Sequence, residues 1–232
     1  FRVGAMPGTV SATLSDAPAP RGMSLASLAI AVEGEARGPG TRHPPIRIRH
    51  VMPRYFETFR IPVIRGRALV EADRRDGSAI LSESAERVLF GARSAIGRRV
   101  RAGGPNEPWL VVVGVAADVR NGERLTDEPQ GELYVAGYRR SDGDSSRTAY
   151  LALRARGRAA RSGAFLRRMI ADLNPRIPVT IETVEQQVAM VTGRERFVAS
   201  LLSAFAILPL LLAGAGLYSV ASYPVTQPTL RM

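Results

Sequence analysis

Cysteine and lysine are both absent from the 232 residues. Without cysteine the chain forms no disulfide and offers no thiolate to a metal, so the sequence is compatible with a reducing or an oxidising compartment. Without lysine, a Walker A loop and an S-x-x-K motif are excluded. No G-x-S-x-G motif occurs either. These absences remove the commonest signatures of nucleotide hydrolysis and of a serine nucleophile.

Histidine is scarce, because His43 and His50 are the only two. Neither has the neighbours that a zinc site or a Ser-His-Asp triad requires, so we expect ordinary surface or loop residues. The carboxylates of Glu71–Gly77 allow a cation site, but a solvated turn with salt bridges to adjacent arginines is the favoured interpretation. Four aromatic residues are expected in the core: Tyr55, Phe56, Phe59 and Trp109. The sequence therefore predicts a non-enzymatic chain with no catalytic, cofactor-binding or metal-binding residue and no cofactor.

Basic charge is abundant, with a formal net charge of +11 and a pI near 11.2, and all of it comes from arginine. Such a balance raises the possibility of a nucleic-acid or anionic-lipid partner. However, the arginines are scattered in short clusters, and no nucleic-acid-binding module accompanies them. We therefore expect solvated arginines that reflect a compositional bias, and no nucleic-acid partner.

The first 22 residues lack an initiator Met, a basic n-region and an apolar h-region. They do not form a signal peptide. We expect the chain to be a fragment of a longer protein.

A long uncharged run, Phe197–Val225, lies near the end of the chain. As a helix, its roughly 29 residues extend over about 43 Å, more than the roughly 30 Å hydrocarbon core of a bilayer. Its proline and glycines are tolerated in membrane helices, and Tyr218 and Tyr223 lie near one end, where interfacial anchors are found. The run predicts one transmembrane helix.

The preceding residues indicate an α+β domain with mixed sheets. A period-2 alternation predicts a half-buried strand at Ile46–Val51, and the continuous run Leu110–Val115 predicts a strand buried on both faces. The other strands are expected at residues 8–15, 25–34, 79–81, 96–103, 131–139 and 148–156. Helices are expected at residues 53–59, opened by Pro53; at 83–90, capped by Ser82 and ended by Gly91; and at 159–173.

Thr183 and Gln186 have the spacing of a capping box, which predicts a helix that continues into the apolar run. The resulting division is an extracytoplasmic domain at 1–182, a stalk helix at 183–196, the transmembrane helix at 197–225 and a truncated tail at 226–232. Two related halves, at about 1–150 and 151–195, are compatible with this order.

Several segments in order resemble the periplasmic core domain of MacB-like and FtsX-like ABC transporter permeases. The similar segments are MPRYFETFRIPVIRGRAL (52–69) with Asp73 following, AILSESAERVLFG (79–91), AIGRRV (95–100) and VVVGVAADVR (111–120). Residues 6–22 resemble the segment after the first membrane helix of the large acidobacterial-type duplicated permeases. Residues 194–232 resemble their second membrane helix, especially that of the C-terminal repeat.

The chain departs from this pattern at four positions. Arg60 stands where glycine is common, Ser219 replaces a glycine, and Pro224 and Pro228 interrupt the usual exit into the cytoplasm. These departures are expected in a truncated or degraded version of such a permease.

The resemblance implies a permease component in a bacterial inner membrane, with its main domain extracytoplasmic. ATP hydrolysis in a separate ATP-binding subunit would then drive domain movement, in export or in mechanotransmission. The implied partners are that ABC ATP-binding subunit, a second permease half or homodimer partner, a periplasmic adaptor and membrane lipid. Two alternatives stay open: a membrane-anchored extracytoplasmic binding or sensor domain without transport, and a soluble interaction protein whose apolar helix packs internally.

Overall fold

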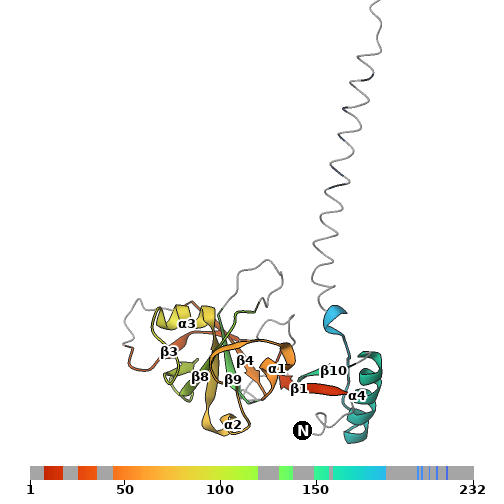
Figure 1. Ribbon diagram of the computed structural model, residues 1–232, viewed down its shortest axis with the longest axis horizontal. Coiled ribbons are helices and arrows are strands. Elements are labelled where there is room, and N and C mark those ends of the chain that lie inside the picture. The colour runs from red at the N-terminus through yellow and green to blue at the C-terminus, as the bar shows by residue number, and fades with distance from the viewer. Residues whose placement is uncertain are drawn as a thin grey trace, which may run out of the picture. The chain divides into compact units, whose positions relative to one another are not determined.

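The computed structural model describes residues 8–17, 26–35, 44–119, 131–137, 149–156 and 159–186, and five isolated helical positions, 203, 205, 209, 213 and 218. The chain divides into two units, 1–188 and 189–232, and the first contains the folded domain (Figure 1). The predicted stalk beyond residue 186, the tail and all but five positions of the predicted transmembrane helix lie outside the described residues. Within the described residues, no helix combines the length and the apolar character needed to cross a bilayer.

Ten strands among the described residues form one mixed sheet, in the order β10-β1-β4-β9-β6-β8-β7-β3, with β2 paired to β4 and β5 paired to β8. Their bounds are β1 (Thr9–Ser15), β2 (Ala26–Leu28), β3 (Ile30–Val32), β4 (Ile46–Val51), β5 (Val63–Gly66), β6 (Ser78–Ser82), β7 (Arg99–Ala102), β8 (Leu110–Ala116), β9 (Glu132–Ala136) and β10 (Tyr150–Ala155). The helices are α1 (Tyr55–Phe59), α2 (Asp73–Asp76), α3 (Glu83–Phe90) and α4 (Ala159–Leu173). The predicted α+β mixed-sheet fold is confirmed.

Pairing in the middle of the sheet closes on itself. β4 and β9 are parallel, β9 and β6 antiparallel, β6 and β8 parallel, and β8 and β7 antiparallel. Only Ala29 separates β2 from β3, and these two strands pair with β4 and with β7 respectively. Residues 26–32 thus connect the two ends of this strand series into a ring. We call β2–β9 with α1–α3 the central lobe.

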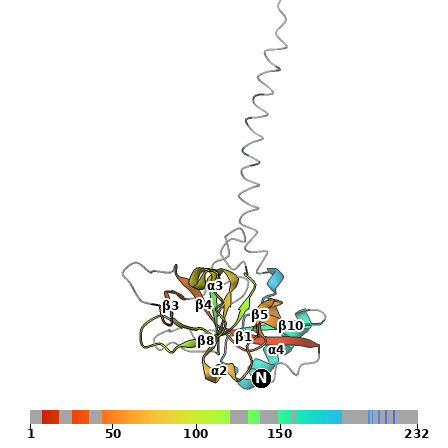
Figure 2. The same ribbon diagram turned by 60° about the vertical axis from the view of Figure 1, so that its left-hand side comes forward.

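The remaining elements form a smaller unit, the side lobe, which consists of β1, β10 and α4. β1 and β10 pair antiparallel from Ser15↔Tyr150 to Thr9↔Ala155, and α4 lies beside them in both views (Figures 1 and 2). α4 begins and ends where the sequence predicts, and its Leu166 is buried.

Two hydrophobic clusters pack on opposite faces of the central strands, because successive side chains of a strand point to opposite sides. The first surrounds α3 and contains residues such as Ile48, Leu81 and Leu133. The second surrounds α1 and contains Tyr55 and Tyr134. The core is therefore double, with one cluster on each face of the sheet.

Local signals predict some element boundaries correctly. Ser82 accepts a hydrogen bond from the Ala85 N–H at 3.2 Å and caps α3, and Gly91 ends that helix with φ 61°. At the predicted strand 25–34 the structure has two short strands separated at Ala29. Pro53 does not open α1, because the left-handed Arg54 (φ 69°) stands between it and the helix.

The prediction of a half-buried β4 is wrong. Its arginines are buried as well as its isoleucines, and Arg49 has no exposed surface. The alternation Ile-Arg-Ile-Arg separates the two faces correctly, but α1 and β9 side chains cover the face that carries the arginines.

Candidate functional site

The most enclosed polar site lies between the parallel strands β4 and β9. Register places Arg49 beside Tyr134. The Arg49 Nη2 atom lies 3.4 Å from Glu132 Oε1, and the side chains are 0% and 2% exposed. Tyr134 donates its hydroxyl hydrogen to Glu132 Oε2 at 2.5 Å, and Arg49 Nη1 donates to the Ala17 carbonyl at 3.2 Å. A buried cation, its carboxylate and a phenol thus connect two strands with the end of β1.

Electrostatics keep Arg49 charged and the two neighbouring phenols neutral. Burial lowers the pKa of Arg49, but the nearby Tyr55 and Glu132 outweigh it, so the net shift is upward and the guanidinium stays charged. Burial is the largest cause that raises the pKa of Tyr55 and of Tyr134, so both phenols stay neutral at neutral pH. Because this ion pair is fixed and inaccessible to solvent, it is suited to holding the strands together and not to catalysis.

A second polar site joins β5 to α2. Arg67 donates to both carboxylate oxygens of Asp73, at 2.6 and 2.8 Å, and the Val70 N–H donates to Asp73 Oδ2 at 2.7 Å. These hydrogen bonds, first those from Arg67, lower the pKa of Asp73, against the opposing effect of burial. The expected salt bridges to arginine are present, and the exposed pair Glu71–Arg74 is another. The expected solvation is wrong for Asp73, whose side chain is only 2% exposed.

A third polar site fixes the start of α3. Asp118, just after β8, accepts from the Ser84 N–H at 2.8 Å and from the Ser84 hydroxyl at 2.5 Å. A carboxylate is favourable at this end of a helix, because the free N–H groups there carry partial positive charge. Glu86, in the same first turn, pairs with Arg65 of β5 and accepts from the Ala95 N–H at 3.1 Å. Charged side chains therefore join α3 to two strands and to the loop that follows it.

Two glycines allow β5 to approach β8 closely. A Cβ atom on Gly66 would collide with the Val113 backbone, and one on Gly114 would lie 2.5 Å from the Arg67 carbonyl oxygen. Gly66 also has a φ of 72°, which other residues rarely adopt. Some motif residues of the sequence thus meet in space, because Gly66-Arg67, Asp73 and Val113-Gly114 all lie at this corner.

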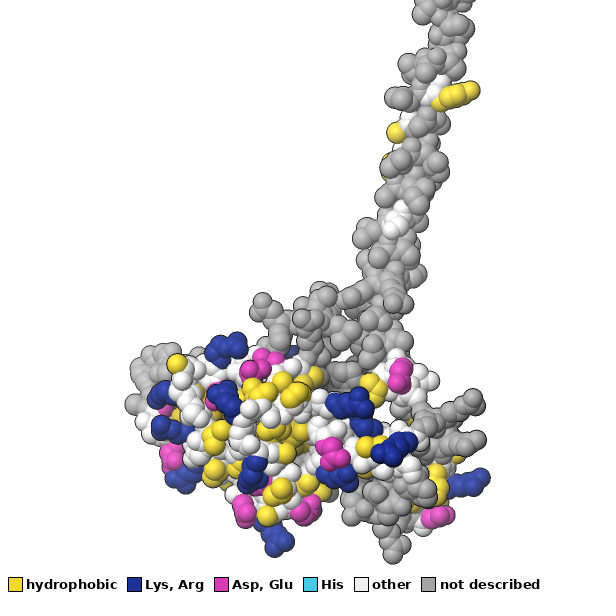
Figure 3. Space-filling view, viewed as in Figure 1, with side chains coloured by type: hydrophobic (Ala, Val, Ile, Leu, Met, Phe, Trp, Pro, Cys, Tyr) yellow, Lys and Arg dark blue, Asp and Glu magenta, His cyan; other side chains and the backbone are white. Residues whose placement is uncertain are grey.

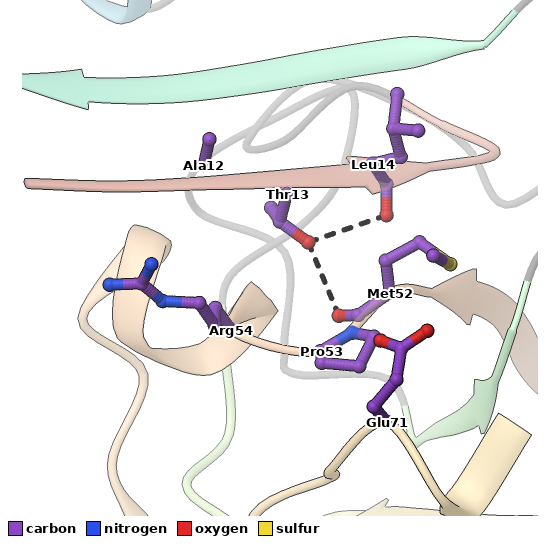
Figure 4. A pocket seen from close by; sticks show the side chains of 7 residues that line it. All are labelled: Ala12, Thr13, Leu14, Met52, Pro53, Arg54 and Glu71. Atoms are coloured by element: carbon purple, nitrogen blue, oxygen red, sulfur yellow. Dashed lines mark hydrogen bonds between the residues drawn. The ribbon is translucent and has the colours of Figure 1, made fainter. Parts of the chain in front are cut away.

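The described residues also line a pocket of about 240 Å³ between β1 and the turn that joins β4 to α1 (Figure 4). Thr13 donates to the Met52 carbonyl at 3.2 Å across it. Its walls are mainly apolar, with two charged side chains at the edge: Ala12, Thr13, Leu14, Met52, Pro53, Arg54 and Glu71. No group of three or more potential metal-ligating side chains occurs in the part of the chain that the structure describes.

Other residues considered from the sequence have structural positions. His50 lies in β4 with its Nδ1 atom 3.1 Å from Asp16 Oδ2, and His43 lies outside the described residues. Tyr55, Phe56 and Phe59 pack in the second cluster as expected. Trp109 is half-buried, and the Arg101 guanidinium lies 4.6 Å from its ring centroid.

The arginines are not all solvated as expected, because Arg47 and Arg49 are buried. Among the described residues on the face shown in Figure 3, the basic side chains are dispersed and alternate with acidic and apolar ones. Several are paired, such as Arg99 with Glu33 and Arg54 with Glu57.

Sequence reasoning missed the Arg49–Glu132 pair. Its signal is the presence of charged residues at inward positions of two otherwise apolar strands, IRIRHV and ELYVA. A partner is required wherever such a charge is buried, but its identity depends on the strand order.

Comparisons with known proteins agree with this architecture. The profile of the MacB-like periplasmic core domain matches residues 3–194. The periplasmic region of MacB from Actinobacillus actinomycetemcomitans aligns with a TM-score of 0.51 at 17% identity, over 74% of this chain and 70% of that chain. A domain of a Porphyromonas gingivalis permease protein aligns with a TM-score of 0.50 at 15% identity, over 79% and 83% of the two chains. The extracellular domain of the noncanonic ABC-type transporter YknZ from Gram-positive bacteria aligns at 19% identity over 75% and 80%, with a TM-score of 0.49.

A comparison with curated proteins finds no match. The fold is that of a mixed-sheet periplasmic domain of the ABC permease type. The chain belongs to the family of MacB-like periplasmic core domains. The resemblance inferred from the motifs is thus confirmed, and residues 3–194 form a MacB-like periplasmic core domain of an ABC transporter permease family.

Proposed function

We propose that this chain comes from the permease component of an ABC transporter and transmits movement between a membrane helix and an extracytoplasmic domain. ATP hydrolysis takes place in a separate ATP-binding subunit, so this chain is not an enzyme and needs no cofactor. The movement serves export of a substrate or mechanotransmission. The parent protein lies in a bacterial inner membrane with its main domain outside the cytoplasm.

The observation that carries this proposal is the family match over residues 3–194, followed at once by the apolar run 197–225. A helix start between the two supports it. Thr183 and Gln186 form a reciprocal capping box, with the Thr183 N–H donating to Gln186 Oε1 at 2.9 Å and the Gln186 N–H donating to Thr183 Oγ1 at 3.2 Å. A helix that begins here and continues to Val225 would act as a lever, and Gly193 is the weak point of its stalk, residues 183–196.

On this proposal the chain is organised as a domain at 1–182, a stalk at 183–196, a membrane helix at 197–225 and a tail at 226–232. The partners are the ABC ATP-binding subunit, a second permease half or a homodimer partner, a periplasmic adaptor and the surrounding lipid.

The test uses the intact parent permease with its ATP-binding subunit in lipid nanodiscs. We expect the two to co-purify, and we expect the permease to stimulate ATP hydrolysis. Gly193→Pro breaks the stalk helix and is expected to reduce the stimulation without releasing the subunit. Gly104→Ala is the control, because a side chain at this exposed loop position meets no other atom. A parent that binds no ATP-binding subunit and stimulates no hydrolysis would refute the permease proposal and favour a membrane-anchored sensor domain.

A further inference from the structure

Neither hydrophobic cluster extends across the junction between the two lobes in the described part of the chain, because neither contains a residue of β1, β10 or α4. Sheet pairing across the junction is also minimal, because Ser15↔Val51 is the one residue pair between β1 and β4 in the part of the chain that the structure describes. Because apolar burial is the main force that locks two units together, this junction is held by other means.

Hydroxyl groups line the junction where α1 packs against β1. Ser11, Thr13 and Ser15 are the buried side chains of β1, and Thr58 on α1 is only 4% exposed. The hydroxyls of Ser11 and Thr58 are buried and have no hydrogen-bond partner within the described part of the chain. Buried hydroxyls of this kind are normally satisfied by ordered water. We call this surface the polar seam.

The hydrogen bonds of the described residues that cross the seam fall into two groups. Beside Ser15, the Met52 N–H donates to the Leu14 carbonyl at 2.9 Å, and Thr13 donates to the Met52 carbonyl at 3.2 Å. Farther along β1, Arg54 donates to the Val10 carbonyl at 3.0 Å, and Arg154 donates to the Thr58 carbonyl at 2.8 Å. The Arg54 side chain is 49% exposed. Water can replace such contacts at small cost, since the net contribution of one hydrogen bond to stability is about 1 kcal/mol.

One end of the seam is held differently. At the end of β1, the Asp16 N–H donates to the His50 carbonyl at 3.2 Å, and the His50 N–H donates to Asp16 Oδ2 at 3.0 Å. Arg49 donates to the Ala17 carbonyl, and Glu132 anchors that arginine in the central lobe. The segment Ser15–Ala17 is therefore fixed, whereas the far part of the seam, around Ser11 and Thr58, has hydroxyls without a hydrogen-bond partner among the described residues.

We propose that the side lobe turns on the central lobe about a hinge at Ser15–Ala17, with the polar seam as a hydrated sliding surface. A fixed point beside a wet, weakly bonded surface is the arrangement that permits rotation without the loss of a packed core. If the proposed function is correct, the side lobe receives the movement of the membrane helix first, because α4 directly precedes the capping box in the chain. The hinge itself does not depend on that function.

The absence of cysteine makes the test direct, because introduced cysteines are the only sites for spin labels. Arg87→Cys on α3 combined with Arg168→Cys on α4 measures the distance between the lobes. Arg87→Cys combined with Arg75→Cys on α2 is the matched control within the central lobe. All three positions are exposed. In the intact chain, we expect a distance distribution between the lobes about twofold wider than the control distribution.

A double variant tests whether the polar seam causes the wider distance distribution. Ser11→Val with Thr58→Val removes the hydroxyls and dries the seam, and we expect the distribution between the lobes to narrow to the control width. A distribution that is already as narrow as the control would overturn the hinge. A broad distribution that the valines leave unchanged would overturn the role of the seam. Both results are independent of ATPase coupling, so the hinge and the proposed function can fail separately.

Discussion

The two faces of the central sheet are built from the same strands by different means. The face under α3 is hydrocarbon, with Leu81 and Leu133 fully buried. The opposite face combines aromatic rings with buried charges, Arg49 paired with Glu132 and, at its edge, Asp73 held by Arg67. A hydrocarbon face tolerates many volume-conserving exchanges, whereas each charge requires one particular partner. We infer that the first face mainly contributes stability and the second fixes which strands lie side by side.

The largest expected effect comes from separation of the buried ion pair. Glu132→Leu leaves Arg49 charged and without its carboxylate, and we expect a loss of about 3–5 kcal/mol in the free energy of unfolding. The double change Arg49→Met with Glu132→Leu removes both charges, and we expect it to recover most of that loss. Chemical denaturation of the purified chain measures each value.

Leu81→Ala on the hydrocarbon face is the matched comparison, with an expected loss of about 2–5 kcal/mol from the cavity that it creates. Leu133→Ala, added to it, is expected to increase the loss. If Arg49→Met with Glu132→Leu lowered the free energy of unfolding as much as Glu132→Leu alone, the distinction between the two faces would be wrong.

A smaller effect is expected at the edge of the charged face, at Asp73. Its pKa is lowered in the folded chain, so its contribution to stability is complete above its ordinary pKa of about 4 and is lost as the pH falls below that value. Asp73→Asn is expected to cost about 1–2 kcal/mol at pH 7, a modest value because Arg67 is half-exposed. Unfolding at pH 7 and at about pH 3 should show that the difference from the wild type shrinks with acid.

Asp76→Asn, on the same short helix but exposed, is the control and is expected to change little. A difference at Asp73 that stayed constant across this pH range would contradict an ionic contribution.

The smallest expected effect is an increase in stability, from a substitution at Arg60. Arg60 follows α1 in the left-handed conformation, with φ 55°, at the position where the resemblance predicts glycine. The left-handed conformation costs a residue with a side chain about 1–2 kcal/mol of folded-state stability, and glycine avoids this strain. Glycine offsets part of the gain, because it gives the unfolded chain more conformational entropy. Arg60→Gly is therefore expected to raise stability by about 0.5–1 kcal/mol, measured as a higher melting temperature.

Arg54→Gly relieves a similar left-handed residue but loses the Glu57 ion pair and the hydrogen bond to Val10. We expect no gain from it, and equal gains at both positions would contradict the strain argument.

The features that the sequence predicts correctly depend on neighbours in the chain. Ser82 and Gly91 mark the two ends of α3 because capping groups act on residues of the same helix. The capping box at Thr183 and Gln186 is confirmed for the same reason. Arg60 shows that even a departure from a family pattern can indicate a backbone conformation.

The features that the sequence does not predict depend on distant pairing. Arg49 and Glu132 are 83 residues apart, and Ser84 and Asp118 are 34 apart. No local pattern indicates that β4 and β9 are neighbours, so the alternation in β4 led to the wrong prediction of an exposed arginine face. Asp73 was expected in water for a different reason: its partner Arg67 is only six residues away, but no residue pattern indicates that the turn between them folds back to bury the carboxylate.

The ring closed by residues 26–32 also determines the order in which the chain can fold. β2 and β3 are made early, but their partners in β4 and β7 come later, and β4 must wait for β9. Pairings between such distant segments form slowly, because the entropy cost of closing a long loop comes before the stabilising contacts are made. During synthesis the edge of β4 that pairs with β9 therefore stays unpaired until residue 136 has been made, and an unpaired strand edge in this interval favours aggregation.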